Sequence, residues 1–114
     1  MGKLSKELIG ASSIPIILTV IEAQETYGYD IIQKVKQASD NKIEWKDGTL
    51  YPVLHKLEKN GYIESYWKVG ESGRKRKYYK ISEDGKLELE AKKENWIFIN
   101  GLLEKLWNVK PNLI

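Results

Sequence analysis

The stretch Asp47-Gly-Thr-Leu-Tyr-Pro-Val-Leu-His-Lys-Leu-Glu-Lys-Asn-Gly61 predicts one short amphipathic helix. Its apolar stripe consists of three leucines whose i, i+4, i+7 spacing places them on one helical face: Leu50, Leu54 and Leu57. The opposite arc carries compact polar and cationic side chains: Pro52, His55, Lys56 and Lys59, with Thr49 and Tyr51 at its two edges. One face is therefore expected to pack against the rest of the chain. The other is either a surface that contacts an anion or an ordinary solvated lysine face.

The two ends of this helix are also marked in the sequence. Asp47 is the predicted N-cap, and Gly61 is the predicted glycine just after the last turn. Pro52 has no backbone N–H, so we expect it to lie within about the first turn.

Length and composition limit the class of protein. A chain of 114 residues indicates a single domain with a modest core, and the absence of cysteine excludes disulfides, thiolate metal sites and a cysteine nucleophile. The longest apolar run, residues 14–21, is far shorter than the roughly 20 residues that span a membrane. The N-terminus lacks the succession of charged, apolar and cleavage-site regions that marks a signal peptide. We therefore expect a cytoplasmic protein that does not associate with membranes.

The positive charge of the chain is concentrated in its middle third. Residues 46–80 hold nine Lys and Arg against four Asp and Glu, a local net charge of +5, whereas residues 1–45 and 81–114 each have a net charge of −1. Clustered positive charge is typical of a surface that binds nucleic-acid phosphates. A solvated lysine face remains the alternative for these residues.

The segments before residue 47 predict further helices. Residues 4–22 are expected to be helical with a fault at Ser12-Ser13-Ile14-Pro15, which fits either one kinked helix or a short helix followed by a second. After a break at residues 26–30, helical periodicity predicts a helix that ends near residues 39–41, and residues 43–45 are expected to form a short extended piece. This order of helices indicates a helix-turn-helix core.

The residues after Gly61 predict a β-hairpin. Residues 62–68 and 77–81 are rich in aromatic and β-branched side chains, and residues 69–73 between them contain two glycines. The loop and its exit strand carry four consecutive cations, Arg74-Lys75-Arg76-Lys77. A basic hairpin directly after a basic-faced helix is typical of a wing that contacts the phosphate backbone or the minor groove of DNA.

The last element is predicted to be a long helix from its N-cap Ser82 to Trp107, about seven turns. Apolar residues at coiled-coil spacing form a seam along it: Leu89, Trp96, Leu103, Ile99 and Leu106. Because a small domain has little core to cover such a seam, we expect this helix to pack against a second subunit together with the N-terminal helix. The alternative is that it folds back on its own domain.

These motifs together closely resemble the PadR family of bacterial transcriptional regulators. The resemblance rests on residues 49–63, on Tyr27-Gly28-Tyr29-Asp30-Ile31, on Gly73-Arg74-Lys75-Arg76-Lys77-Tyr78-Tyr79 and on Glu83-Asp84-Gly85. It implies a homodimer that binds a double-stranded DNA operator and represses a promoter until a small molecule or stress signal releases it. The single C-terminal helix is similar to the compact branch of LmrR-type multidrug-sensing repressors.

The resemblance also implies site residues. It places Thr49, Tyr51, Pro52 and Lys56 at the major groove and its phosphates, and Arg74, Lys75 and Arg76 on the wing. Tyr29 is a candidate phosphate contact that positions the protein, or part of a packed turn, and Tyr51 fits either the DNA or a half-buried place against the hairpin. In the multidrug-sensing members, a tryptophan at the place of Trp96 helps to sandwich flat aromatic drugs between subunits. The alternative is that Trp96 is an ordinary packing residue of the dimer core. Leu8, Pro15 and Asn100 match positions that line that pore, although the neutral Asn100 stands where an acidic group would favour cations.

An enzyme is not expected. His55 is the only histidine, so neither a catalytic triad nor a histidine metal site can be assembled, and the glycines form no phosphate-binding motif. No cofactor and no metal are predicted. The sequence thus predicts an α+β, mainly α, winged helix-turn-helix DNA-binding domain at residues 1–81, a dimerisation helix at 82–108 and a tail at 109–114. The alternative is a dimeric interaction module whose basic hairpin binds an acidic protein.

Overall fold

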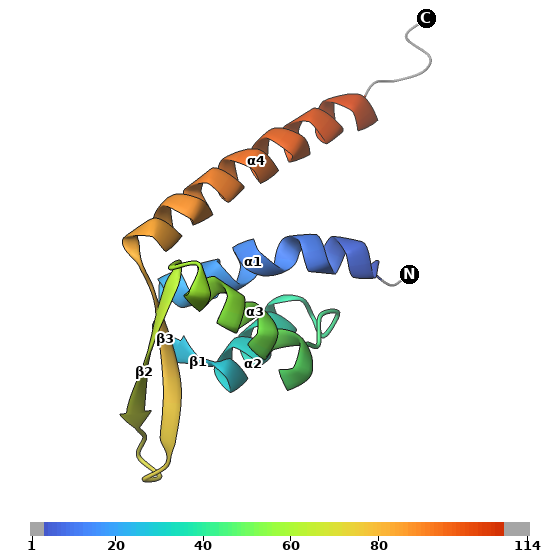
Figure 1. The fold of residues 1–114 in the computed structure, drawn as a ribbon. Coiled ribbons are helices and arrows are strands. Elements are labelled where there is room, and N and C mark those ends of the chain that lie inside the picture. Colours follow the sequence, from blue (N-terminus) through green and yellow to red (C-terminus); the bar gives the residue numbers. More distant parts are fainter. Residues whose placement is uncertain (1–3, 109–114) are drawn as a thin grey trace, which may run out of the picture.

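The computed structural model describes residues 4–108, which form four helices and three short strands (Figure 1). In chain order these are α1 (Lys6–Ala23), β1 (Thr26–Tyr27), α2 (Gly28–Ala38), α3 (Asp47–Lys59), β2 (Ile63–Val69), β3 (Lys75–Ile81) and α4 (Glu83–Trp107). The α+β, mainly α, architecture predicted from the sequence is confirmed. The predicted tail, residues 109–114, lies outside the described residues.

The first helix runs through the predicted fault without interruption. α1 contains Pro15, so of the two interpretations the single helix is correct. The hydroxyl of Ser12 donates to the Leu8 carbonyl at 2.7 Å, and that of Ser13 donates to the Gly10 carbonyl at 2.9 Å. The two hydroxyls thus bind carbonyls of the turn before the proline, whereas the carbonyl that loses its N–H donor to Pro15 is that of Ala11.

The core lies where α1, α2 and α3 meet the base of the hairpin. The predicted leucine stripe of α3 is buried, together with apolar residues of the other elements: Ile17, Leu18, Ile21, Ile31, Ile32, Val35, Trp45, Leu50, Leu54, Leu57, Ile63, Tyr79 and Leu89. This packing fixes the side of α3 that faces inward. The opposite side, which carries its lysines, remains exposed.

The structure differs from the sequence-based predictions at the start of α3, at Pro52 and after α2. The N-cap of α3 is Lys46 rather than Asp47, and it makes no side-chain capping bond. Pro52 is the sixth residue of the helix rather than a residue of its first turn. Residues 43–45 form no strand; the segment after α2 turns through the left-handed residues Asp40 and Asn41, with φ of 52° and 68°. Gly61 has the positive φ of 81° expected of a glycine after a helix.

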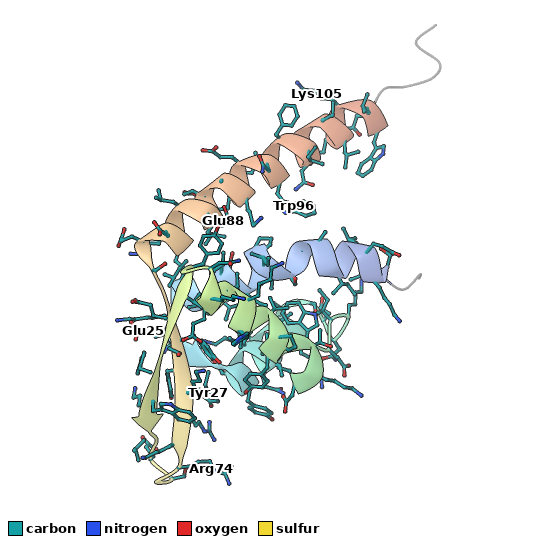
Figure 2. The ribbon with its side chains drawn as sticks, viewed as in Figure 1. Glu25, Tyr27, Arg74, Glu88, Trp96 and Lys105 are labelled. Atoms are coloured by element: carbon teal, nitrogen blue, oxygen red, sulfur yellow. The ribbon has the colours of Figure 1, made fainter. Side chains whose placement is uncertain are left out.

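The sheet contains one strand more than the predicted hairpin. Its order is β1-β3-β2, all antiparallel, and the two residues of β1 pair with the inner part of β3 as Thr26↔Tyr79 and Tyr27↔Tyr78. β3 begins at Lys75, two residues before the predicted strand, so three of the four consecutive cations lie in the strand. Only Arg74 stands in the loop, at the tip of the hairpin in Figure 2.

The last helix projects from the domain. Figure 1 shows α1 between α4 and the α2–α3 pair, while the far end of α4 extends away from the wing. Leu89, one residue of the predicted seam, is already buried in the core of its own domain and needs no second subunit to cover it. The radius of gyration is 17.1 Å, against about 13 Å for a compact domain of this length.

Candidate nucleic-acid interface

The outer arc of α3 presents polar and cationic side chains to solvent. Burial of its leucine stripe leaves the other arc exposed: Thr49, Pro52, His55, Lys56 and Lys59. The helix has 13 residues, a length of about 20 Å, and a major groove of about 12 Å admits such a helix. Lys56 and Lys59 lie in its last turn, where they also complement the helix dipole.

A groove of about 630 Å³ lies between this helix and the hairpin. We call it the wing groove, and its lining is aromatic and basic: Tyr27, Tyr29, Tyr51, Trp67, Arg74, Lys75, Arg76, Lys77 and Tyr79. Among these described lining residues none is acidic. The groove therefore combines tyrosine hydroxyls, which are hydrogen-bond donors, with four cations, and this combination suits a phosphodiester strand.

Tyr51 is positioned by a close approach between two helices. A Cβ atom on Gly28, at the start of α2, would lie only 2.5 Å from the Tyr51 hydroxyl oxygen, so the glycine leaves room for that ring. The ring is 43% exposed and lines the wing groove. Tyr51 is thus half-exposed, with its ring against α2 and near Tyr79 of the hairpin.

Tyr79 places a protonated phenol at the floor of the groove. Burial, together with the neighbouring Tyr51 and Glu58, raises the pKa of Tyr79 to about 12. Its hydroxyl therefore remains a neutral donor at physiological pH.

The wing is held to α3 by one carboxylate. Glu58 accepts a hydrogen bond from the Ser65 hydroxyl of β2 and forms an ion pair with Lys77 of β3 at 3.6 Å. The Lys77 ammonium also lies 5.8 Å from the centre of the Tyr79 ring. Both strands of the hairpin are thereby fixed relative to the helix whose outer arc is basic.

The opposite face of the sheet carries a stack of aromatic and cationic groups. Tyr78 contacts Tyr27 and Tyr66, with ring centres 5.3 and 5.8 Å away, and the Arg76 guanidinium lies 4.4 Å from the centre of Tyr27. The Tyr66 hydroxyl donates to Glu25 at 2.5 Å, and this hydrogen bond raises the pKa of Tyr66. Figure 2 shows Glu25 and Tyr27 beside the strands of the wing. The stack holds Arg76 at the edge of β3, where it lines the wing groove.

The predicted DNA residues fall into two groups. Five of them line the wing groove together: Tyr29, Tyr51, Arg74, Lys75 and Arg76. Pro52 and Lys56 are exposed on α3 outside this groove, and Thr49 borders a separate hollow next to α1 and Trp45. Sequence reasoning did not select four other groove residues, namely Tyr27, Trp67, Lys77 and Tyr79. The strand alternation after Gly61 would have placed Trp67, Lys77 and Tyr79 on one face, but not the short strand that adds Tyr27.

The predicted ligand residues are also divided. Pro15 and Trp96 line one apolar cavity of about 570 Å³ between α1, α2 and α4, and Figure 2 shows Trp96 on the side of α4 that faces α1. Leu8 and Asn100 do not line this cavity; both are exposed on their helices. Within residues 4–108 there is no cluster of metal-ligating side chains and no helix long and apolar enough to cross a membrane.

The fold and this interface define the class of protein. Three helices share one core and expose the basic arc of the third helix, and a hairpin with a basic groove follows them. This arrangement is that of a DNA-binding winged helix-turn-helix.

Comparison with known proteins identifies the family. The sequence model of the transcriptional regulator PadR-like family matches residues 17–91, about two thirds of the chain. The chain belongs to this family, whose members are DNA-binding transcriptional regulators and not enzymes. The matched residues include the whole winged helix-turn-helix after the first part of α1. They do not include Leu8, Pro15, Trp96 or Asn100.

Solved structures agree with this assignment. A PadR-like transcriptional regulator from Bacillus cereus has a TM-score of 0.83 at 28% identity, covering 92% of this chain and 100% of that one. A transcriptional regulator from Clostridium thermocellum has a TM-score of 0.79 at 33% identity, with the same coverage. A curated relative from Lysinibacillus sphaericus, described as uncharacterized, is 36% identical over 89 residues, 78% of this chain and 82% of its own.

Proposed function

We propose that this PadR-like regulator is a homodimeric, cytoplasmic repressor that a small planar ligand releases from its operator. The observation that carries the DNA side of the proposal is the wing groove, because five of the DNA-contact residues predicted from the sequence, from α2, α3 and the wing, line it together. In this proposal Thr49, Pro52 and Lys56 approach the major groove. Tyr29, Tyr51 and the wing cations contact the adjacent phosphates.

The far half of α4 supports a dimer. Large apolar side chains are exposed along it: Ile97, Phe98, Ile99, Leu102, Leu106 and Trp107. Apolar surface on this scale is typical of a protein–protein contact. A two-fold pair of subunits would place two α3 helices on one face of DNA, with half-sites about one turn apart.

The start of α4 is bonded to the end of α3, so a ligand that moves α4 can also move the DNA-binding helix. The Ser82 hydroxyl donates to the Gly61 carbonyl at 2.5 Å, and the Ser82 N–H donates to the Tyr62 carbonyl at 3.1 Å. Gly61 follows α3 directly, so the end of that helix is bonded to the start of α4. A ligand between the subunits at Trp96, flanked by Leu8, Pro15 and Asn100, would change the angle of α4 and with it the spacing of the two α3 helices.

DNA binding is tested by fluorescence anisotropy with the duplex directly upstream of the protein's own gene and a scrambled duplex, over a salt series. Lys56→Ala and Arg74→Ala should each weaken binding and reduce the salt slope by about two per dimer, because each removes one phosphate contact per subunit. Sedimentation should show an unchanged dimer. Unchanged slopes for both variants would refute this DNA face. An equal affinity for both duplexes at every salt concentration would favour the alternative, a basic module for an acidic partner.

Ligand binding is tested with a planar aromatic dye. Trp96→Ala should abolish the quenching of protein fluorescence that the dye causes, whereas Trp107→Phe should retain it, because an indole supplies the stacking surface. Quenching that survives in Trp96→Ala would remove Trp96 from the proposed site.

A further inference from the structure

We propose that Trp67, together with Val69, forms an apolar ridge on the inner face of the wing that packs against the deoxyribose groups of a DNA strand lying in the wing groove. This inference rests on DNA binding by the wing and adds a contact to it. Neither residue belongs to the basic set selected from the sequence.

The strand register places both side chains on the inner face. In β2, Ile63, Ser65, Trp67 and Val69 pair in turn with Ile81, Tyr79, Lys77 and Lys75 of β3. Because side chains alternate across a strand, these four β2 residues share one face. Ile63 on this face is buried in the core, so the face points toward α3 and not toward the solvent side of the sheet.

This face is buried at the base of the wing and exposed near its tip. Ile63 is 1% exposed, whereas Trp67 is 66% and Val69 is 58% exposed. The base of this face therefore packs in the core, whereas the part near the tip of the wing is not covered by α3. A large indole at this place presents apolar surface whose burial is favourable once a partner arrives.

The indole has no aromatic or cationic partner among the described residues. The aromatic pairs join Tyr27, Tyr66 and Tyr78 on the opposite face of the sheet, and the nearby Lys77 ammonium lies over Tyr79. The ring of Trp67 is thus available to an outside group.

The surroundings select DNA as that group. The indole shares the wing groove with Arg74, Lys75, Arg76 and Lys77, and no described lining residue is acidic. An apolar protein segment would leave these charges without partners, whereas a phosphodiester strand neutralises them. Between its phosphates such a strand presents sugar carbons, which suit the indole ring and the valine methyl groups. The indole N–H is a donor only, so it suits a phosphate oxygen.

Affinity measurements separate this contact from the charge contacts. With the duplex upstream of the protein's own gene, Trp67→Ala should weaken binding roughly tenfold at every salt concentration. Its salt slope should equal that of the wild type, because no cation is removed. Trp67→Thr replaces the indole by a β-branched residue that suits a strand, and it should show the same loss. Leu87→Ala is the matched control, because Leu87 is 70% exposed but lies on α4, outside the groove lining.

Fluorescence gives a direct readout of the same contact. Addition of the duplex should quench and shift the emission of the wild type and of Trp107→Phe, and Trp67→Phe should lose most of this change. Trp67 variants that bind as tightly as the wild type, or a DNA-induced change that survives in Trp67→Phe, would overturn the proposal. If the wild type itself binds no duplex, the function proposed above fails instead.

Discussion

Gly85, at the start of α4, allows a close backbone approach between this helix and the wing. A Cβ atom at this position would lie 2.0 Å from the Tyr62 carbonyl oxygen, 2.9 Å from its carbonyl carbon and 2.7 Å from Cγ1 of Ile81. Two of these atoms belong to the backbone of the residue that enters β2, so no side-chain rotation relieves the clash. In Gly85→Ala, the helix and the strand must separate by about 1 Å.

The expected cost follows from these contacts. Overpacking against backbone costs roughly 1–3 kcal/mol, and the bond from the Ser82 N–H to the Tyr62 carbonyl, now 3.1 Å long, contributes about 1 kcal/mol. Alanine regains about 1 kcal/mol through its higher helix propensity. We expect the free energy of unfolding to fall by about 2 kcal/mol and Tm to fall by roughly 8 °C.

Urea titrations followed by circular dichroism, at one fixed protein concentration, measure this change. Gly10→Ala is the matched control: Gly10 also lies inside a helix, but a Cβ there meets nothing within 4 Å. That variant should gain up to about 1 kcal/mol. If Gly85→Ala is as stable as the wild type, or gains as much as Gly10→Ala, the account of this contact is wrong.

Two further predictions concern the tyrosines of the wing groove. Gly28→Ala should push the Tyr51 ring away from α2 and weaken promoter binding by about 5- to 30-fold, as measured by anisotropy. The free energy of unfolding, measured by urea titration, should change by less than about 1 kcal/mol because the ring is half-exposed. If both Gly28→Ala and Tyr51→Phe bind DNA as tightly as the wild type, Tyr51 is not a DNA contact. The raised pKa of Tyr79, about 12 against 10.0 in an unfolded chain, means that the folded protein keeps a proton which the unfolded chain loses. Its contribution to stability is therefore complete below pH 10 and is lost as the pH rises from 10 to about 12. Urea titrations at about pH 9 and about pH 11 should show a smaller decline for Tyr79→Phe than for the wild type, and an equal decline would contradict this assignment.

The sequence predicted α3 well because its pattern is local. The i, i+4, i+7 leucines require a buried face, and burial of that face determines which polar residues remain outside. Ser82 is also predictable, since its hydroxyl accepts the Gly85 N–H at 3.0 Å as an N-cap should. Local signals of this kind need no knowledge of the rest of the chain.

The errors arise where tertiary contacts decide. β1 has only two residues, and its pairing partner, β3, lies about 50 residues later; Thr26 and Tyr27 therefore looked like part of a turn. Pro52 was expected nearer the start of α3, yet the helix tolerates it at its sixth position because the leucines on either side of it are packed in the core. Tertiary packing here outweighs local propensity.

The wing groove was predicted only in part for a similar reason. Cationic residues stand out in a sequence, and Arg74, Lys75 and Arg76 were found in this way. The exposure of Trp67 depends on how far β2 extends past α3, and the position of Tyr27 depends on its pairing with β3. Neither fact is encoded in a short stretch of sequence.

NMR mapping of the backbone amides, while the duplex upstream of the protein's own gene is added, shows directly whether DNA lies across α3 and the wing groove. If DNA binds there, the largest shifts occur at Tyr29, Tyr51, Lys56 and residues 74–77. Glu64 and Lys80, on the opposite face of the sheet, should change little. Shifts that cluster on that opposite face, with residues 74–77 unchanged, would show that DNA does not lie in the wing groove.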